Sequence, residues 1–283
     1  MTTLFIEALR EARATIEAAR PQASTAEPGE ATVARRLLSE LDDAIAHLDG
    51  SEFGKDLVSI VCHDLKDPLA SIVMGAGFLR KTIPADQSAA RRVVDAISRS
   101  ADRMSQLISD FHDLARLEAG ALSFDPRRCE IVPILSGAIR SFEAEARERR
   151  LEVTLTAEGE RLAVMGDPVR LTQLASKLIA NAVKFTAPGG RVLVHASEVN
   201  GRVRMAVNDT GRGIPADRFG RLFDYAANAR RTPRDGPGLG LAIVRGLVDL
   251  HHGDITVESR VGEGSTFAVV LPRASANATP SIA

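Results

Sequence analysis

Residues 202–215 read RVRMAVNDTGRGIP, an alternating run followed by a carboxylate and two glycines. The alternation of apolar and polar residues over 202–208 predicts a half-buried β-strand. Asp209 stands where this strand ends, and Gly211 and Gly213 follow it. A carboxylate there can accept a hydrogen bond from an exocyclic amine, and glycines let backbone approach a purine ring closely. Taken alone, this stretch is a weak indication of a nucleotide pocket.

Two further motifs lie upstream and downstream of this stretch. The motif NAVKF (181–185) ends a helix predicted over about 168–185, and GPGLGL (236–241) opens a helix predicted over about 239–251. Backbone N–H groups at a helix N-terminus can bind phosphates, and the amide oxygen of Asn181 suits Mg²⁺, which prefers oxygen ligands. The three motifs in this order are a strong indication of nucleotide binding.

The segments around these motifs predict an α/β sandwich. A further helix is expected over about 131–150, where apolar residues follow the helical period. Besides 202–208, strands are expected at 151–156, 191–199, 254–259 and 265–271. Strands and helices mixed in this way favour a mixed sheet with helices on one face.

The preceding part of the chain carries a heptad pattern, which is typical of helices in bundles. One set of apolar residues steps by three and four along Val58, Val61, Leu65, Pro68, Ile72, Gly75 and Leu79. A second set does so along Val94, Ile97, Ala101, Met104, Ile108, Phe111 and Ala115. A loop around Pro84 and Ala85 separates them. Such a helical hairpin buries its seams fully only by pairing with a second copy, so a four-helix bundle made by two chains is expected.

The motif HDLKDPL (63–69) lies on the first heptad helix. His63 falls between seam positions Val61 and Leu65, so it is expected to point away from the bundle core. A neutral imidazole can attack a γ-phosphate, and a neighbouring carboxylate, here Asp64, can orient the ring and hold its proton. The alternative is an ordinary surface His-Asp pair, and these residues alone do not separate the two.

Length and composition limit the classes of protein to consider. With 283 residues, the chain has room for about two domains and an appendage. Its 36 Lys and Arg nearly balance its 37 Asp and Glu, so neither nucleic acid nor an anionic membrane is an expected partner. The apolar runs are shorter than the roughly 20 residues of a membrane helix, and the N-terminus lacks the layout of a signal peptide. Both observations predict a cytoplasmic protein. Cys62 and Cys129 lack the spacing of a zinc site.

From about 53 to 272 the chain resembles the sensor histidine kinases of two-component systems. HDLKDPL resembles the H box of the family, NAVKF its N box, DTGRGIP its first glycine box and GPGLGL its second, while residues 219–224 resemble a weak F box. Several boxes in the right order make the resemblance specific. It implies an α+β protein: a helical-hairpin dimerisation and phosphotransfer domain, then an ATP-binding domain of the gyrase and Hsp90 type.

The resemblance also implies a role for each motif residue. His63 becomes the phosphoryl acceptor, with Asp64 as its acid-base partner, and Asn181 becomes the Mg²⁺ ligand. Lys184 lies near the phosphates, and Asp209 takes the adenine amino group. The glycines that shape the pocket wall and the lid over the triphosphate are Gly211, Gly213, Gly236, Gly238 and Gly240. ATP and Mg²⁺ are therefore the implied cofactors.

The predicted organisation has four parts. They are an N-terminal helical and linker segment for signal input (1–50), the dimerisation and histidine phosphotransfer domain (51–122), the catalytic ATP-binding domain (123–273) and a disordered tail (274–283). Because a typical sensory domain has about 100 residues, a separate sensory protein at the N-terminal helices is one route for the signal. The other implied partners are a second copy of the chain and the receiver domain of a response regulator, whose aspartate accepts the phosphoryl group.

Three positions depart from the family pattern. Lys177 stands where many members carry asparagine or an acid, and it could hold phosphate or weaken Mg²⁺ binding. Ala226 replaces the second phenylalanine of the F box, and Asp67 stands where Thr or Asn is common. These departures keep a second function open, a dimeric signalling scaffold or pseudokinase that binds partners without catalysis. A serine kinase or ATPase of the same superfamily would lack a heptad hairpin with an H box.

Overall fold

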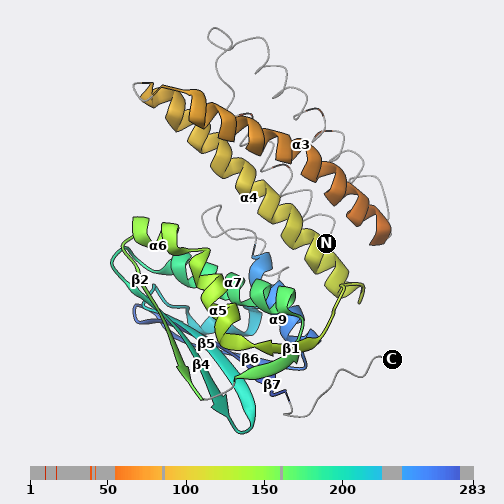
Figure 1. Cartoon of the computed structure of the whole chain (residues 1–283), viewed down its shortest axis with the longest axis vertical. Coiled ribbons are helices and arrows are strands. Elements are labelled where there is room, and N and C mark those ends of the chain that lie inside the picture. Colours follow the sequence, from red (N-terminus) through yellow and green to blue (C-terminus); the bar gives the residue numbers. More distant parts are fainter. Residues whose placement is uncertain are drawn as a thin grey trace. The chain divides into compact units, whose positions relative to one another are not determined.

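The computed structural model describes most of the chain from residue 55 onwards. The described ranges are 55–84, 87–159, 162–224 and 238–274, with the single residues Arg10, Glu17, Ser39 and Asp42. Backbone alone is described for 55–61, 63, 64, 67, 68, 88 and 89. The described chain folds as two units, whose boundary in the sequence falls between Gly120 and Ala121 (Figure 1).

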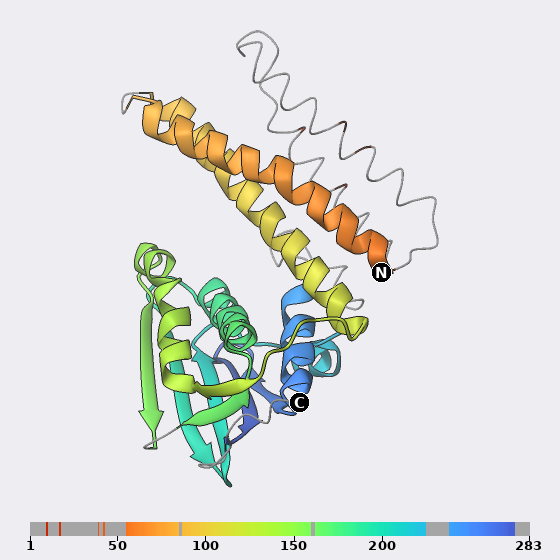
Figure 2. The same cartoon turned by 45° about the vertical axis from the view of Figure 1, so that its right-hand side comes forward.

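The first unit is a helical hairpin. Helix α3 (Lys55–Thr82) and helix α4 (Ser88–Glu118) lie side by side along their length (Figure 2). The guanidinium of Arg91 donates to the carbonyl oxygen of Ile83 at 2.8 Å, which holds the start of α4 against the connecting loop. Both predicted heptad helices and the break at Pro84 are confirmed.

The predicted seam of α3 is confirmed at Leu65 and Ile72, which are half-buried, and is wrong at Gly75 and Leu79, which are exposed. The fully buried residues are Cys62, Leu69 and Ala76, each one position after a predicted seam residue. A helix in a four-helix bundle touches two neighbours, so its apolar face is wider than a single seam. Among the described residues, α4 covers only one flank of that face, which explains the exposed seam positions. The α4 seam is confirmed in that its residues are buried or half-buried, namely Val94, Ile97, Ala101, Met104, Ile108, Phe111 and Ala115.

The second unit contains a mixed five-stranded sheet in the order β2-β4-β5-β7-β6. Its strands are β2 (Glu152–Glu158), β4 (Arg191–Val199), β5 (Arg202–Asp209), β6 (Asp254–Arg260) and β7 (Gly264–Pro272). β2 pairs parallel to β4, and the other neighbours are antiparallel. All five strands were predicted. The separate pair β1 (Arg127–Glu130) and β3 (Ala163–Gly166) was not, because four residues are too few to display an alternation.

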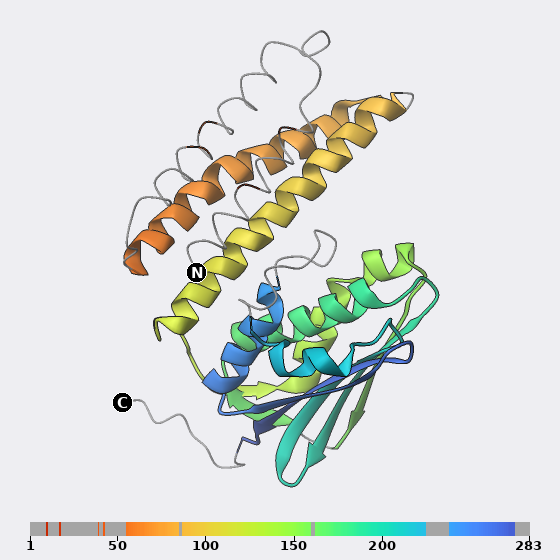
Figure 3. The ribbon, with the colours of Figure 1, turned by 180° about the vertical axis from the view of Figure 1, so that it is seen from behind.

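Helices cover one face of this sheet (Figure 3). They are α5 (Ile131–Arg140), α6 (Glu143–Glu148), α7 (Pro168–Phe185) and α9 (Leu239–Leu250), with a 3-10 turn η1 (Ala216–Arg221). The buried side of the sheet is a row of apolar residues in register, such as Val194, Val207 and Phe267. These residues face the buried stripes of α7 and α9, so the core lies between the two layers.

Helix α7 has the bounds that the sequence predicts, and both of its ends are capped. Asp167 accepts the backbone N–H of Val169 at 2.8 Å and of Arg170 at 3.2 Å, and Pro168 needs no acceptor at the first helical position. At the other end, the guanidinium of Arg149 donates to the carbonyl oxygens of Val183 and Thr186. The caps fix where α7 stops.

The predicted helix over 131–150 is wrong in one respect, because it breaks in the middle. The N–H of Ser141 bonds the carbonyl of Ala138, and the N–H of Phe142 bonds that of Ile139, three residues back instead of four. This tighter turn ends α5, and α6 begins after it. The apolar period continues across the break, so the sequence does not reveal it.

The turn between β4 and β5 consists of Asn200 and Gly201. Both have positive φ, 52° and 73°, and Val199 pairs with Arg202 on either side of them. This is the conformation of a two-residue type I′ hairpin, for which Asn-Gly is the preferred sequence.

Candidate nucleotide and phosphotransfer site

Asp209 ends strand β5 with its carboxylate turned inward. Only 6% of the residue is exposed, and its Oδ1 accepts the N–H of Gly211 at 2.8 Å. The N–H of Ser265 on β7 also donates to the carboxylate. Burial raises the pKa of Asp209 above its ordinary value, and these two backbone donors oppose that rise. The result is a buried acceptor held in one orientation at the end of a central strand.

The residues after Asp209 tolerate no side chain at two positions. A Cβ on Gly211 would lie 2.6 Å from the Phe185 carbonyl oxygen, and one on Gly213 would lie 2.0 Å from the Arg260 carbonyl oxygen. Gly213 also has φ of +68°, which favours glycine. The loop is therefore pressed between the end of α7 and the start of the β6–β7 turn.

Cationic side chains gather where α7 meets this loop. The Lys184 ammonium lies 5.0 Å from the centre of the Phe185 ring, and the Arg212 guanidinium lies 4.7 Å from it. Such distances allow cation–π attraction. Asn181 lies one helical turn before Phe185 and is half-buried on the same side of α7. The structure thus brings the NAVKF end of α7 together with Asp209, Gly211 and the loop that follows.

Helix α9 opens with the second glycine motif. Gly238 is its N-cap with φ of +73°, and no described side chain caps the first turn. A Cβ at Gly240 would meet no atom within 4 Å in the described structure. Uncapped N–H groups beside open space suit an anionic ligand. The helix packs beside α7, which carries Asn181 (Figure 1). Gly236 and Ala226 lie outside the described residues.

The β6–β7 turn is part of the site, although its residues were not singled out from the sequence. A Cβ on Gly264 would lie 1.8 Å from the Asp209 carbonyl oxygen, so the two strand ends touch through backbone. The Ser259 hydroxyl accepts the N–H of Ile214 at 2.8 Å and donates to the Gly264 carbonyl at 2.7 Å. The paired glycines of VGEGS (261–265) were the signal that could have revealed this support.

The predicted phosphotransfer residues lie in the other unit. His63 and Asp64 belong to α3, and their side chains are outside the described part of the structure. That His63 points away from the hairpin core stays a prediction. Among the described residues, no three His, Cys, Asp or Glu side chains are grouped as metal ligands.

Comparison with known proteins decides the family. Residues 55–120 match the His Kinase A (phospho-acceptor) domain, and residues 166–275 match the histidine kinase-, DNA gyrase B- and HSP90-like ATPases. The chain belongs to the sensor histidine kinases. The two matched domains place this histidine kinase in two-component signalling and give it an ATP-binding domain, and the α+β fold of hairpin and sandwich is confirmed.

Individual relatives match the chain over both of these domains. Sensor protein DivL of Caulobacter vibrioides is 34% identical over 242 residues, covering 85% of this chain and 31% of DivL. Sensor histidine kinase ZraS of Escherichia coli is 31% identical over 216 residues, covering 76% of this chain and 45% of ZraS. The crystal structure of full-length ShkA in complex with AMPPNP superposes with a TM-score of 0.66 and 32% identity, over 80% of this chain and 47% of that one. The chain spans less than half the length of each of these relatives.

No membrane span is found in the described part of this histidine kinase. Each helix there falls short of the combined length and apolar character that crossing a bilayer requires.

Proposed function

We propose that this chain is an ATP-dependent protein-histidine kinase, which phosphorylates its own His63 and transfers the phosphoryl group to an aspartate of a response regulator. In this proposal the segment 51–122 supplies the acceptor and the dimer contacts, and 123–273 supplies the nucleotide site. The observation that carries it is the buried Asp209 carboxylate, held by Gly211 and Ser265 at the end of β5. An acceptor so placed suits the exocyclic amine of adenine.

The remaining residues of the site fit Mg-ATP. Gly211 has no room for a side chain beside the Phe185 carbonyl, so the backbone after Asp209 can turn tightly there and keep the carboxylate in place for a base. Lys184 and Arg212 bring positive charge to the end of α7, and the start of α9, which no described side chain caps, offers N–H groups to phosphates. In this proposal Mg²⁺ is held by one amide oxygen, that of Asn181, and by phosphate oxygens. The ion, when bound, neutralises charge on the triphosphate.

The proposed reaction is an in-line displacement on the γ-phosphorus. A lone pair on a ring nitrogen of His63 forms the new P–N bond, and the bond between the γ-phosphorus and the bridging oxygen breaks, so that its electron pair leaves with ADP. Asp64 accepts a hydrogen bond from the other ring nitrogen, which keeps the attacking nitrogen unprotonated. Most of the rate comes from positioning and charge neutralisation.

A second candidate is a catalytically inactive scaffold, which one position of the site favours. Lys177 lies on α7 one helical turn before Asn181, so its ammonium shares a helix face with the proposed metal ligand. A cation there would repel Mg²⁺. A chain that binds ADP but never labels His63 would be such a scaffold.

One assay separates the two candidates. The chain is incubated with Mg²⁺ and γ-labelled ATP, and the label is tested for loss in acid and survival in alkali, as expected of phosphohistidine. Acid-labile label that maps to His63 supports the kinase. Absence of any label in a folded chain supports the scaffold, whether or not ATP binds, and contradicts the kinase.

Dimerisation is expected to use the exposed apolar flank of α3. Met74 is 71% exposed and Phe78 is 68% exposed, four residues apart on the same side of the helix. The phospho-acceptor domain match generally implies a homodimer, and a second copy would cover these side chains. The same hairpin carries His63, so a receiver domain would dock on it.

Replacing both Met74 and Phe78 with glutamate should make the chain monomeric. Each buried, unpaired carboxylate would cost several kcal/mol in the dimer, whereas in the monomer both would be solvated. Sedimentation equilibrium measures the mass. Val261→Glu is the matched control, because Val261 is another exposed apolar residue but lies in the β6–β7 turn of the second unit. A double variant that remains dimeric would place the interface elsewhere.

A further inference from the structure

The segment that leaves the hairpin is anchored on the ATP-binding unit. After α4 and Gly120, the chain passes through residues 121–126 before it enters β1. Leu122 is buried and Phe124 is half-buried. The backbone N–H of Asp125 donates to Oδ2 of Asp167 at 3.1 Å. These contacts are made inside the second unit, so this linker is part of its fold.

A buried histidine stands at the centre of the anchorage. His251 is 3% exposed and meets the ring of Phe124 edge-on, with 5.0 Å between ring centres. Its Nδ1 lies 2.7 Å from the Leu247 carbonyl oxygen, which can only accept, so Nδ1 carries the proton. Its Nε2 is then bare and accepts the N–H of Asp167 at 3.2 Å. Burial also lowers the pKa of His251, which agrees with a neutral ring.

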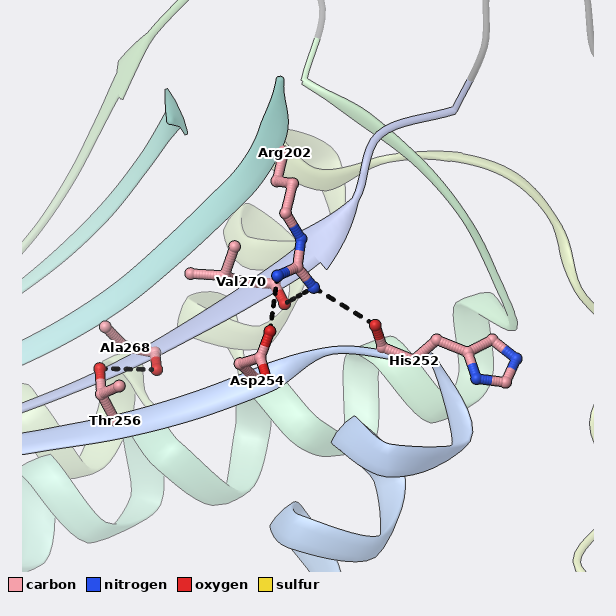
Figure 4. Close-up of polar contacts among 6 residues, drawn as sticks. All are labelled: Arg202, His252, Asp254, Thr256, Ala268 and Val270. Atoms are coloured by element: carbon pink, nitrogen blue, oxygen red, sulfur yellow. Dashed lines mark hydrogen bonds and ion pairs between the residues drawn. The ribbon is translucent and has the colours of Figure 1, made fainter. Parts of the chain in front are cut away.

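The backbone around His251 leaves room for its ring, and further contacts hold the turn in which it lies. A Cβ on Gly166 would lie 2.7 Å from Cδ2 of His251, so only glycine leaves room there. On the far side of the turn, Arg202 donates to the His252 carbonyl at 3.3 Å and pairs with Asp254 at 2.5 Å (Figure 4). Arg202 also reaches the Val270 carbonyl, which ties the turn to β7 (Figure 4). The turn after α9 is thus fixed from both sides.

From these contacts we propose that Phe124, His251 and Asp167 form a clasp, which docks residues 122–126 on the ATP-binding unit and confines the hinge between the units to Gly120. Gly120 suits a hinge because its φ is +64°, which glycine adopts without strain, and because a Cβ built there would meet no atom within 4 Å. The clasp is a positioning device: it sets how far the nucleotide site can travel toward His63. This consequence rests on the proposed kinase function.

Opening the clasp, and with it the neighbouring contacts of Leu122 and of Ser123 with Arg170, would lengthen the flexible tether from Gly120 alone toward residues 120–126. Once a tether is longer than the span it bridges, the effective concentration of the tethered group falls roughly with the −3/2 power of its length, so autophosphorylation should slow on the order of tenfold. Nucleotide affinity should not change, because Asp209 and Asn181 lie outside the clasp. A purely structural role of Phe124 would instead lower nucleotide affinity and rate together.

The test compares Phe124→Ala with the wild-type full-length chain. We expect faster hydrogen exchange at the Asp125 amide, about tenfold slower labelling of His63 and unchanged ADP affinity. Phe142→Ala is the matched control, since Phe142 is another half-buried phenylalanine of the same unit outside the clasp. His251→Leu, which removes both ring hydrogen bonds, should repeat the effect if it folds.

Each other outcome decides one part of the proposal. Unchanged exchange at Asp125 in Phe124→Ala would show that no clasp holds the linker. Faster exchange with an unchanged labelling rate would remove its role in positioning, as would an equal loss of ADP affinity. If the wild type never labels His63, the proposed kinase function fails, while exchange at Asp125 still decides whether the clasp exists.

Discussion

Replacing His63 with glutamine should reduce acid-labile phosphorylation to background while leaving ADP affinity unchanged. Glutamine keeps the side-chain length and polarity but has no nucleophilic nitrogen, because its amide lone pair is delocalised. The nucleotide residues lie in the other unit, so they do not depend on this side chain. Labelling with γ-labelled ATP and calorimetric titration with ADP measure the two properties.

His112→Gln is the control for the His63 variant. His112 is another histidine of the hairpin, on α4, and is half-buried. It should label as the wild type does. Acid-labile phosphate that persists in His63→Gln would assign the acceptor to a different residue.

Replacing Asp209 with asparagine should weaken ADP binding by about 100-fold, as expected when a charged acceptor of a buried hydrogen bond is lost. The Gly211 and Ser265 N–H groups still need acceptors, so the asparagine oxygen turns toward them. Its NH₂ group then meets the adenine amine as a second donor. Titration with ADP gives the affinity, and thermal unfolding shows whether the variant is folded.

Asp249→Asn is the control for Asp209→Asn. Asp249 is an exposed carboxylate of α9 that pairs with Arg245 on the same helix. An exposed pair of this kind contributes little, so both stability and ADP affinity should stay near the wild type. A folded Asp209→Asn variant with normal ADP affinity would remove Asp209 from the pocket.

Much of the sandwich could be predicted from the sequence, because the signals there are local. Asp167 and Pro168 are residues typical of a helix start and indicate where α7 begins. The alternation of apolar and polar residues predicts β4 and β5. The break at Ser141 could not be predicted, since it changes hydrogen bonds and not the apolar period. The exposure of Gly75 and Leu79 on α3 has a similar origin, because a heptad pattern shows that a helix has an apolar face but not which neighbour covers which flank.

The sequence predicts which motif residues belong to the candidate site, but it does not predict which other residues contact them. The sequence indicates Asp209 and its glycines, yet the second donor to the carboxylate is Ser265 and the hydroxyl that holds the loop is that of Ser259, both on strands far along the chain. The anchorage of Phe124 by His251 is equally non-local, because the two residues are brought together only by the complete fold. The roles of all the predicted site residues, from His63 and Asp64 to Asn181, Asp209 and the glycines, remain predictions.

The Asn200–Gly201 turn has a consequence for how the domain folds. Closing a two-residue loop costs little chain entropy. The parallel pairing of Glu152 with Arg191 costs more, because it closes a long loop that contains β3 and α7. Both turn residues already favour the left-handed conformation that the hairpin requires. The β4–β5 hairpin should therefore form early, with β2 joining late as an edge strand. A Gly201→Val variant should then refold more slowly than the wild type in stopped-flow measurements, and an unchanged refolding rate would place the first step elsewhere in the sheet.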